Sequence, residues 1–284
     1  MSTQHAEGNY LVRRMTRQDL DVAVEWAAAE GWNPGLGDAD RFFAADPNGF
    51  LIGLLDGKPV ASLSAVAYDA TFGFLGFYIV KPELRGCGYG IKVWQAAMDY
   101  LGDRNVGLDG VLAQQRNYEK SGFVAAYHNV RHEGVGGGET PKGLVKLSAV
   151  KFDELLEYDA PLFGTGRAAF LRGWIDQPGA TTAAKLKDGK LAGYSVMRPC
   201  LRGFKIGPLF AEDESTAEDL FQAMAAAAPG QPIILDVPET NSAALALARR
   251  HQMKTVFETV RMYNNSPLRL DVNRIYGITT FELG

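Results

Sequence analysis

Apolar and polar residues follow two kinds of pattern along the chain, and these patterns predict a mixed α/β fold. Alternating or continuous apolar runs predict strands at residues 10–14, 50–55, 60–67, 74–80, 106–108 and 123–131. Apolar residues spaced three and four apart predict helices at residues 16–27, 38–45, 91–101 and 114–121. The resulting order is β-α-α-β-β-β-α-β-α-β.

The second half of the chain repeats the first in weaker form. Asp188-Gly-Lys repeats Asp56-Gly-Lys, and each begins a predicted strand. Residues 253–261 stand in register with residues 123–131, and a predicted helix at 217–228 occupies the place of the helix after Gly88. These repeats predict two domains.

A boundary between the two domains is predicted at a glycine-rich stretch. Residues 134–138 contain four glycines, and a proline follows at position 141. We therefore expect a first domain at residues 1–133, a linker at 134–143 and a second domain at 144–284. A fragment of residues 1–140 should then keep whatever site the first domain carries.

A glycine-rich turn joins the predicted strand at 74–80 to the following helix. The turn reads Arg85-Gly-Cys-Gly-Tyr-Gly90, and its glycines allow a sharp bend that leaves backbone N–H groups uncovered. A helix that begins there adds the positive end of its dipole, and Arg85 adds a cation suited to phosphate oxygens. The spacing fits neither a P-loop, which needs Lys-Ser/Thr after the last glycine, nor a Gly-x-Gly-x-x-Gly dinucleotide turn.

This turn resembles the pyrophosphate loop of the GNAT superfamily of acyl-CoA-dependent N-acyltransferases. The family pattern Arg/Gln-x-x-Gly-x-Gly/Ala is matched here after a Val-x-Pro that commonly ends the family's fourth strand. The residues that carry the match are Val80, Pro82, Arg85, Gly86, Cys87, Gly88, Tyr89 and Gly90. The resemblance implies two tandem GNAT-like domains of the α/β (α+β) class, each a mixed, mostly antiparallel sheet flanked by helices. It also implies acetyl-CoA as acyl donor, with the main-chain groups of Ile79 and Val80 beside the thioester.

The resemblance extends to a candidate general acid. The family's Tyr-x-Lys-x-Gly-Phe run is matched by Tyr118-Glu-Lys-Ser-Gly-Phe123, which implies that Tyr118 protonates the departing thiolate. Two nearby positions depart from the family pattern, since Val111 replaces an asparagine and Gln114 an alanine. Packing of Tyr118 on an amphipathic helix is the alternative role.

The general base stays open among four residues, each of which also suits a surface charge or a satisfied polar group. They are Glu25, Glu30, Asp109 and His128. For the acceptor amine, we expect binding by the loop that holds Glu30, Trp32 and Asn33, because an acid, an indole and an amide lie there beside a turn. Trp32 is equally suited to a place in the core.

The second half lacks the features that would bind acyl-CoA. Residues 210–218 contain four carboxylates and no glycine where the first half has its glycine turn. A pyrophosphate would be repelled there, whereas acidic residues suit the first turn of a helix. Ala248 stands at the position of Tyr118. We therefore predict that only the first domain binds acyl-CoA.

Composition bounds the remaining possibilities. A net charge of −4 without a basic cluster disfavours nucleic acid as a partner, and no apolar run reaches membrane-spanning length. Residues 1–14 are too polar for a signal peptide, and two cysteines suit a reducing compartment, so we expect a cytoplasmic protein. His128 and His132 lie in a predicted strand, where their spacing does not favour a metal site.

The sequence thus predicts an acetyl-CoA-dependent N-acetyltransferase that acts directly on a small-molecule amine. Two alternatives stay open. The chain could be a non-catalytic acyl-CoA-binding or sensing module with a protein partner. It could also transfer a longer acyl group or modify a protein lysine.

Overall fold

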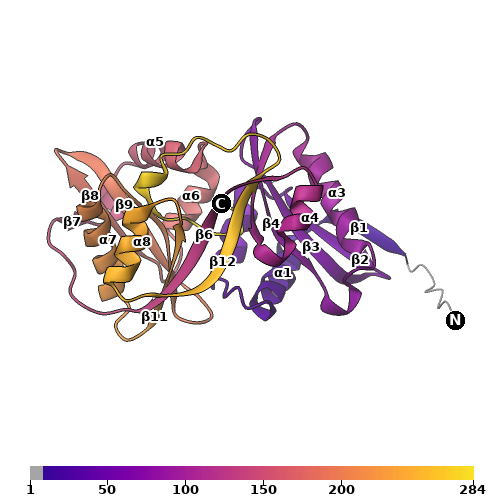
Figure 1. Ribbon diagram of the computed structural model, residues 1–284, viewed down its shortest axis with the longest axis horizontal. Coiled ribbons are helices and arrows are strands. Elements are labelled where there is room, and N and C mark those ends of the chain that lie inside the picture. Colours follow the sequence, from indigo (N-terminus) through magenta and orange to yellow (C-terminus); the bar gives the residue numbers. More distant parts are fainter. Residues whose placement is uncertain (1–8) are drawn as a thin grey trace.

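The computed structural model describes residues 9–284, which form a single 13-stranded sheet with helices packed on its faces (Figure 1). Most of the N-terminal segment from which we excluded a signal peptide lies outside the described residues. The strand order is β1-β2-β3-β4-β5-β12-β6-β11-β10-β9-β8-β7, and β13 pairs with β10 off this path. The two halves of the chain lie side by side, and β6 and β12 run between them (Figure 1).

The elements of the first half agree with the predicted order. Its strands are β1 (Tyr10–Arg14), β2 (Phe50–Leu55), β3 (Lys58–Ala67), β4 (Phe72–Val80), β5 (Asn105–Val111) and β6 (Val124–Val135). Its helices are α1 (Arg17–Ala29), α2 (Asp38–Ala45), α3 (Tyr89–Leu101) and α4 (Gln115–Lys120), with short 3-10 helices η1 (Pro82–Leu84) and η2 (Leu112–Gln114). The predicted capping box begins α1, because Thr16 and Asp19 each bond the other's backbone N–H.

The second half has a related set of elements. Its strands are β7 (Leu144–Val145), β8 (Thr181–Lys187), β9 (Lys190–Pro199), β10 (Phe204–Ala211), β11 (Pro232–Pro238), β12 (Lys254–Tyr263) and β13 (Ile275–Gly277). Its helices are α5 (Phe152–Phe163), α6 (Ala168–Ile175), α7 (Glu214–Ala226) and α8 (Ser242–Arg250), with η3 (Leu147–Ala149) and η4 (Val272–Arg274). Parallel pairing joins β4 to β5 and β10 to β11, and the other strand pairs are antiparallel. This is the predicted fold class, and it occurs twice.

The two repeated strands are exchanged between the halves. β12 pairs with β5 of the first half, while β6 pairs with β11 of the second, and the two exchanged strands pair with each other. Asn129 faces Thr259, which is its equivalent in the repeat. The two repeated strands therefore pair antiparallel and symmetrically about this position. The boundary predicted after residue 133 falls inside β6, which continues to Val135. Gly136 and Gly137 then donate backbone hydrogen bonds to Gln231 and Ala225.

Equivalent buried ion pairs hold each exchanged strand in place. Arg131 on β6 binds Asp236 on β11 through two hydrogen bonds of 2.7 Å each. Arg261, the repeat of Arg131, binds Asp109 on β5 at 2.8 and 2.7 Å. All four side chains are buried, so each arginine neutralises a carboxylate that could not be left unpaired.

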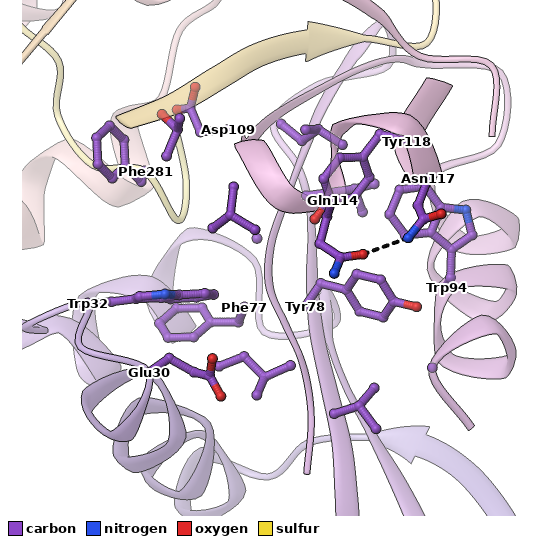
Figure 2. Close-up of a pocket in the computed structure, with 18 of the residues that line it drawn as sticks. Glu30, Trp32, Phe77, Tyr78, Trp94, Asp109, Gln114, Asn117, Tyr118 and Phe281 are labelled. Atoms are coloured by element: carbon purple, nitrogen blue, oxygen red, sulfur yellow. Dashed lines mark hydrogen bonds between the residues drawn. The ribbon is translucent and has the colours of Figure 1, made fainter. Parts of the chain in front are cut away.

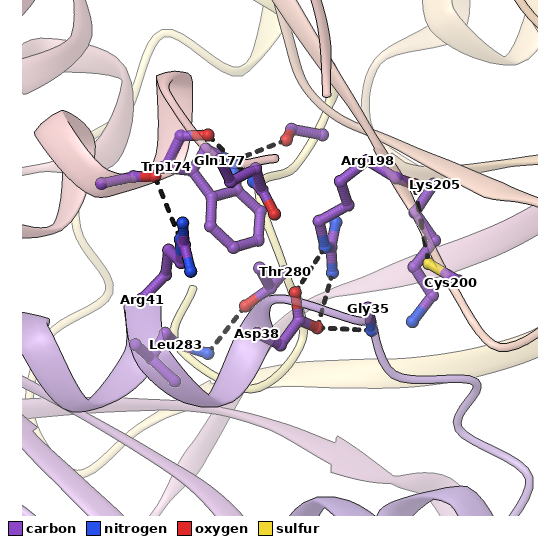
Figure 3. Close-up of polar contacts among 12 residues, drawn as sticks. Gly35, Asp38, Arg41, Trp174, Gln177, Arg198, Cys200, Lys205, Thr280 and Leu283 are labelled. Carbon is purple, nitrogen blue, oxygen red and sulfur yellow. Dashed lines mark hydrogen bonds and ion pairs between the residues drawn. The ribbon is translucent and has the colours of Figure 1, made fainter. Parts of the chain in front are cut away.

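A third buried pair links helix α2 to the second half (Figure 3). Arg198 on β9 donates to Asp38 at 2.8 Å, and Asp38 also accepts from the backbone N–H of Gly35. The Arg198 guanidinium lies over the Trp174 ring, which stacks on Phe42 of α2. The apolar core is therefore shared between the halves.

Candidate active site

A cavity of about 620 Å³ opens where β4 and β5 diverge. The two strands pair in parallel only as far as Leu75 and Leu108, and the register of β4 against β3 then shifts at a bulge. Phe77 at the bulge has a φ of 46°, and its carbonyl accepts a hydrogen bond from Ser62 at 2.8 Å. The bulge turns the end of β4 away from β5, which leaves main-chain groups facing the cavity.

Val80 presents its main-chain groups to this opening, whereas Ile79 does not. The N–H of Lys81 bonds to Val60 on β3, and Ala61 and Val80 are Cα partners. Residues in an antiparallel ladder alternate in direction, so Ile79 faces β3 and Val80 faces the cavity. Consistently, the Val80 carbonyl accepts from Arg85 Nε at 3.0 Å. Of the two predicted main-chain groups, that of Val80 therefore faces the cavity.

The predicted glycine turn lies at one end of the cavity. Gly86 and Gly88 have φ values of 80° and 84°, which favour glycine, and a side chain at either would point into open space. Gly90, in the first turn of α3, packs so closely on Tyr78 and Val80 that a Cβ would overlap them. Of the other turn residues, Cys87 is exposed and the Tyr89 ring packs on Tyr10.

Arg85 lies at the mouth of the cavity but reaches away from the turn. Besides its bond to Val80, its guanidinium forms an ion pair with Glu30 at the end of α1. The Arg85 side chain is about half exposed, so a bound anion could compete with Glu30 for it.

Tyr118, the candidate general acid, lines the cavity from α4 (Figure 2). Its ring stacks on Trp94 of α3 with centroids 5.8 Å apart. Burial, with a smaller effect of Tyr78, raises the pKa of Tyr118 well above its ordinary value. Tyr118 is therefore a neutral phenol at physiological pH and retains a proton that it can donate.

The far end of the cavity has aromatic walls that come from both halves. Trp32 and Phe77 point into it from the first half, and Phe281 lines it from the second (Figure 2). Phe257 of the second half is also among the lining residues. The Trp32 carbonyl accepts hydrogen bonds from Arg131 and from the buried Lys205, which hold the Trp32 backbone in place.

The three residues predicted to bind the acceptor separate into two groups. Glu30 and Trp32 line the cavity. Asn33 does not, because its side chain makes two hydrogen bonds of 2.9 Å with the backbone of Arg202 and so ties the loop to the second half.

The four candidate bases separate in the same way. Asp109 and Glu30 line the cavity, but each is paired with an arginine. Glu25 and His128 are not among the lining residues, and His128 faces Glu239. Sequence reasoning missed the lining residues that come from the second half, which are Phe257, Thr259, Phe281 and Glu282.

The corresponding opening of the second half is filled by its own chain. β10 and β11 pair in parallel as far as Ile206 and Leu235, and β13 then pairs with β10 where the two strands diverge. Asn241 at the start of α8 donates to three carbonyls of residues 272–275 and so fixes the approach to β13.

The acidic run of the second half caps a helix, as expected. The side chain of Asp213 accepts from the N–H of Thr216 at 2.9 Å and caps α7, and Asp213 also pairs with Lys187. Ala248 is buried at the place that Tyr118 takes in the first half.

Comparison with known proteins agrees with this repeated architecture. The acetyltransferase (GNAT) family model matches residues 17–123, and an acetyltransferase (GNAT) domain model matches residues 155–277. Holothin acyltransferase of Pseudoalteromonas sp. (strain SANK 73390) is 33% identical over 270 residues, which is 94% of this chain and 92% of that protein.

Solved structures share the fold. A candidate acetyltransferase from Pyrococcus horikoshii superposes with a TM-score of 0.84 at 22% identity, covering 100% of both chains. A tandem GNAT protein from the clavulanic acid biosynthesis pathway superposes with a TM-score of 0.63 at 13% identity, covering 91% of this chain and 100% of that one.

The chain therefore belongs to the GNAT family of acyltransferases. Within that family it is a tandem-GNAT protein, and it is an enzyme that transfers acyl groups. Across residues 9–284, no helix is long and apolar enough to cross a membrane. Over the same range, no cluster of three His, Cys, Asp or Glu side chains is arranged to hold a metal ion.

Proposed function

We propose that the protein transfers an acetyl group from acetyl-CoA directly to the amine of a small molecule. The observation that carries this proposal is the single cavity that joins the glycine turn at one end to the aromatic walls at the other. In this arrangement the donor enters beside Gly86 and Gly88, and the acceptor occupies the end beside Trp32. The reacting atoms then meet at the bulge of β4.

The residues between these two ends supply the chemistry that acyl transfer needs. The N–H of Val80 faces the cavity and is the donor for the developing oxyanion. The neutral phenol of Tyr118 is the proton donor for the departing thiolate. Aromatic walls exclude water and bind a small apolar acceptor better than a flexible protein lysine.

We further propose one acyl-CoA site per chain. The opening of the second half holds β13, and the acidic run caps α7. In this proposal the second half binds no donor and instead supplies part of the wall at the acceptor end of the cavity. The cavity and the acyltransferase relative favour an enzyme over a non-catalytic sensor.

The test is acyl transfer measured by release of free CoA thiol and by the mass of the product. Donors are acetyl-, butyryl- and benzoyl-CoA. Acceptors are holothin, taken from the relative's name, then aniline and benzylamine, with a lysine peptide as the protein-type acceptor. Acetyl transfer to a small amine supports the proposal. Acylation of the peptide alone, or preference for a longer donor, contradicts it.

A further inference from the structure

A segment from the end of the second half forms part of the cavity wall. Residues 278–284 leave β13 and run to the bulge of β4, where a Cβ on Gly76 would overlap the carbonyl of Glu282. The N–H of Leu283 bonds to Thr280 at 2.9 Å, and its carbonyl accepts from Tyr68 at 2.7 Å. These contacts hold Glu282 in a fixed position beside the cavity that it lines.

The Glu282 carboxylate is buried without a partner. Its residue is 4% exposed, and among residues 9–284 no side chain or backbone group donates to Oε2, which is itself buried. The buried Asp38, Asp109, Asp159 and Asp236 differ, because each binds an arginine. Burying a carboxylate without hydrogen bonds is costly, so this group needs either a ligand or a functional reason.

The charges around Glu282 balance one another. Arg131, Arg198 and Lys205 lie close enough for their charges to interact with the Glu282 carboxylate. Arg131 is paired with Asp236 and Arg198 with Asp38, and Lys205 donates to the Trp32 carbonyl. Among the described residues, Lys205 is thus the one cation of the three that no other carboxylate binds, and it lies near Glu282 without covering it.

We propose that Glu282, contributed by the second half, is the proton acceptor for the acceptor amine. This inference rests on the proposed function. The amine nitrogen attacks the thioester carbonyl and forms the C–N bond. Its proton passes to the Glu282 carboxylate. The C–S bond then breaks, and Tyr118 gives the thiolate a proton. Exchange with water returns both side chains to their starting states, so the amide and free CoA are the net products.

The same surroundings indicate the class of acceptor. The formal charges of these three cations and of the carboxylates of Asp38, Asp236 and Glu282 sum to zero. No net negative field therefore attracts an ammonium ion. Aromatic side chains surround the position, and the buried hydroxyl of Thr259, which also lines the cavity, lacks a partner among the described residues. A flat, neutral aromatic amine with a polar group next to it fits this end. Aniline should therefore be a better acceptor than benzylamine at neutral pH.

The test compares Glu282→Gln with a matched control, Glu258→Gln. Glu258 lies on β12 between two cavity-lining residues, Phe257 and Thr259, but does not line the cavity itself. We expect Glu282→Gln to lower kcat/KM for aniline about 100-fold at neutral pH. The residual rate should rise with hydroxide concentration, while acetyl-CoA affinity stays unchanged and Tm does not fall. Glu258→Gln should leave all of these at the values of the unsubstituted chain.

Three results overturn the inference. The first is an unchanged kcat/KM and pH profile in Glu282→Gln. The second is a parallel loss of acetyl-CoA affinity and Tm, which marks a structural charge. If that variant does not fold, Glu282→Asp decides. The Glu282→Asp variant keeps the carboxylate but shortens the side chain by one methylene, which should lower kcat/KM. An unchanged kcat/KM in this variant is the third result. Failure of the unsubstituted chain to bind acetyl-CoA or acylate any amine contradicts the proposed function itself.

Discussion

Residue Tyr118 shows how a local motif and its burial combine. The motif places the tyrosine on α4, and packing against Trp94 removes its ring from water, which raises the pKa of the hydroxyl. In the proposed role the hydroxyl donates its proton only as the C–S bond breaks, so its loss should slow turnover more than it weakens binding of the donor. The two functions should therefore separate on mutation.

We predict that Tyr118→Phe lowers kcat about 100-fold without changing acetyl-CoA affinity, because only the proton donor is lost. Steady-state kinetics and calorimetric titration measure the two quantities. The Tyr100→Phe variant is the control, since Tyr100 bonds to Asp46 away from the cavity. Retention of the full kcat by Tyr118→Phe would remove the general-acid role.

The glycine turn allows a second comparison of matched residues. Gly88 and Gly57 have φ values of 84° and 77°, and a Cβ on either would contact nothing. Alanine at either position should cost about 1 kcal/mol in unfolding free energy. Only Gly88→Ala should weaken acetyl-CoA binding, because only Gly88 adjoins the donor. Equal affinities for the two variants in calorimetry would contradict the placement of the donor.

At the scale of elements, much of this structure could be predicted from the sequence. The strands and helices of the first half follow from hydrophobic period, and Asp56-Gly57 and Asp188-Gly189 both form turns with positive φ, as the repeat indicated. Which of the two repeated strands pairs with β5 could not be predicted. Residues 123–131 and 253–261 share one pattern of apolar residues, so either strand could pair with the edge of β5. The pattern alone does not distinguish between them.

The cavity-lining residues of the second half could not be predicted from the sequence for the same reason. Glu282 approaches Gly76 across more than two hundred positions of sequence, and nothing local in either segment marks the contact. The filling of the second opening by β13 is equally a matter of tertiary packing. In contrast, the glycine turn before α3 and Tyr118 on α4 lie in the same half, and a local motif marks each of them at the one cavity.

The exchanged strands depend on their buried arginines. We predict that Arg261→Met destabilises the protein by about 3–5 kcal/mol in urea unfolding, because Asp109 is left buried without its cation. Replacing both partners, as Arg261→Met with Asp109→Leu, should recover most of this loss. Arg17→Met, which removes surface pairs with Asp21 and Asp40, should cost less than about 1 kcal/mol. A double variant as unstable as the single one would contradict the explanation.

For the whole molecule, the exchange changes what the isolated halves should do. Residues 1–140 include β5 but not β12, so β5 would have an unpaired edge and the cavity would lack its Phe257, Thr259 and Phe281 wall. We predict that this fragment alone does not bind acetyl-CoA. Co-expressed with residues 141–284, it should copurify and bind one acetyl-CoA per pair in calorimetry. Full affinity in the first fragment alone would show that β12 is dispensable.

The place of β12 also has a consequence for synthesis of the chain on the ribosome. The strand that completes the first half is translated more than a hundred residues after β5. Until then, a nascent chain carries an open sheet edge next to apolar side chains, which is the condition that invites aggregation. Folding of the first half must therefore await almost the entire polypeptide. Slow translation or a missing chaperone should cost this enzyme more yield than a single-domain relative.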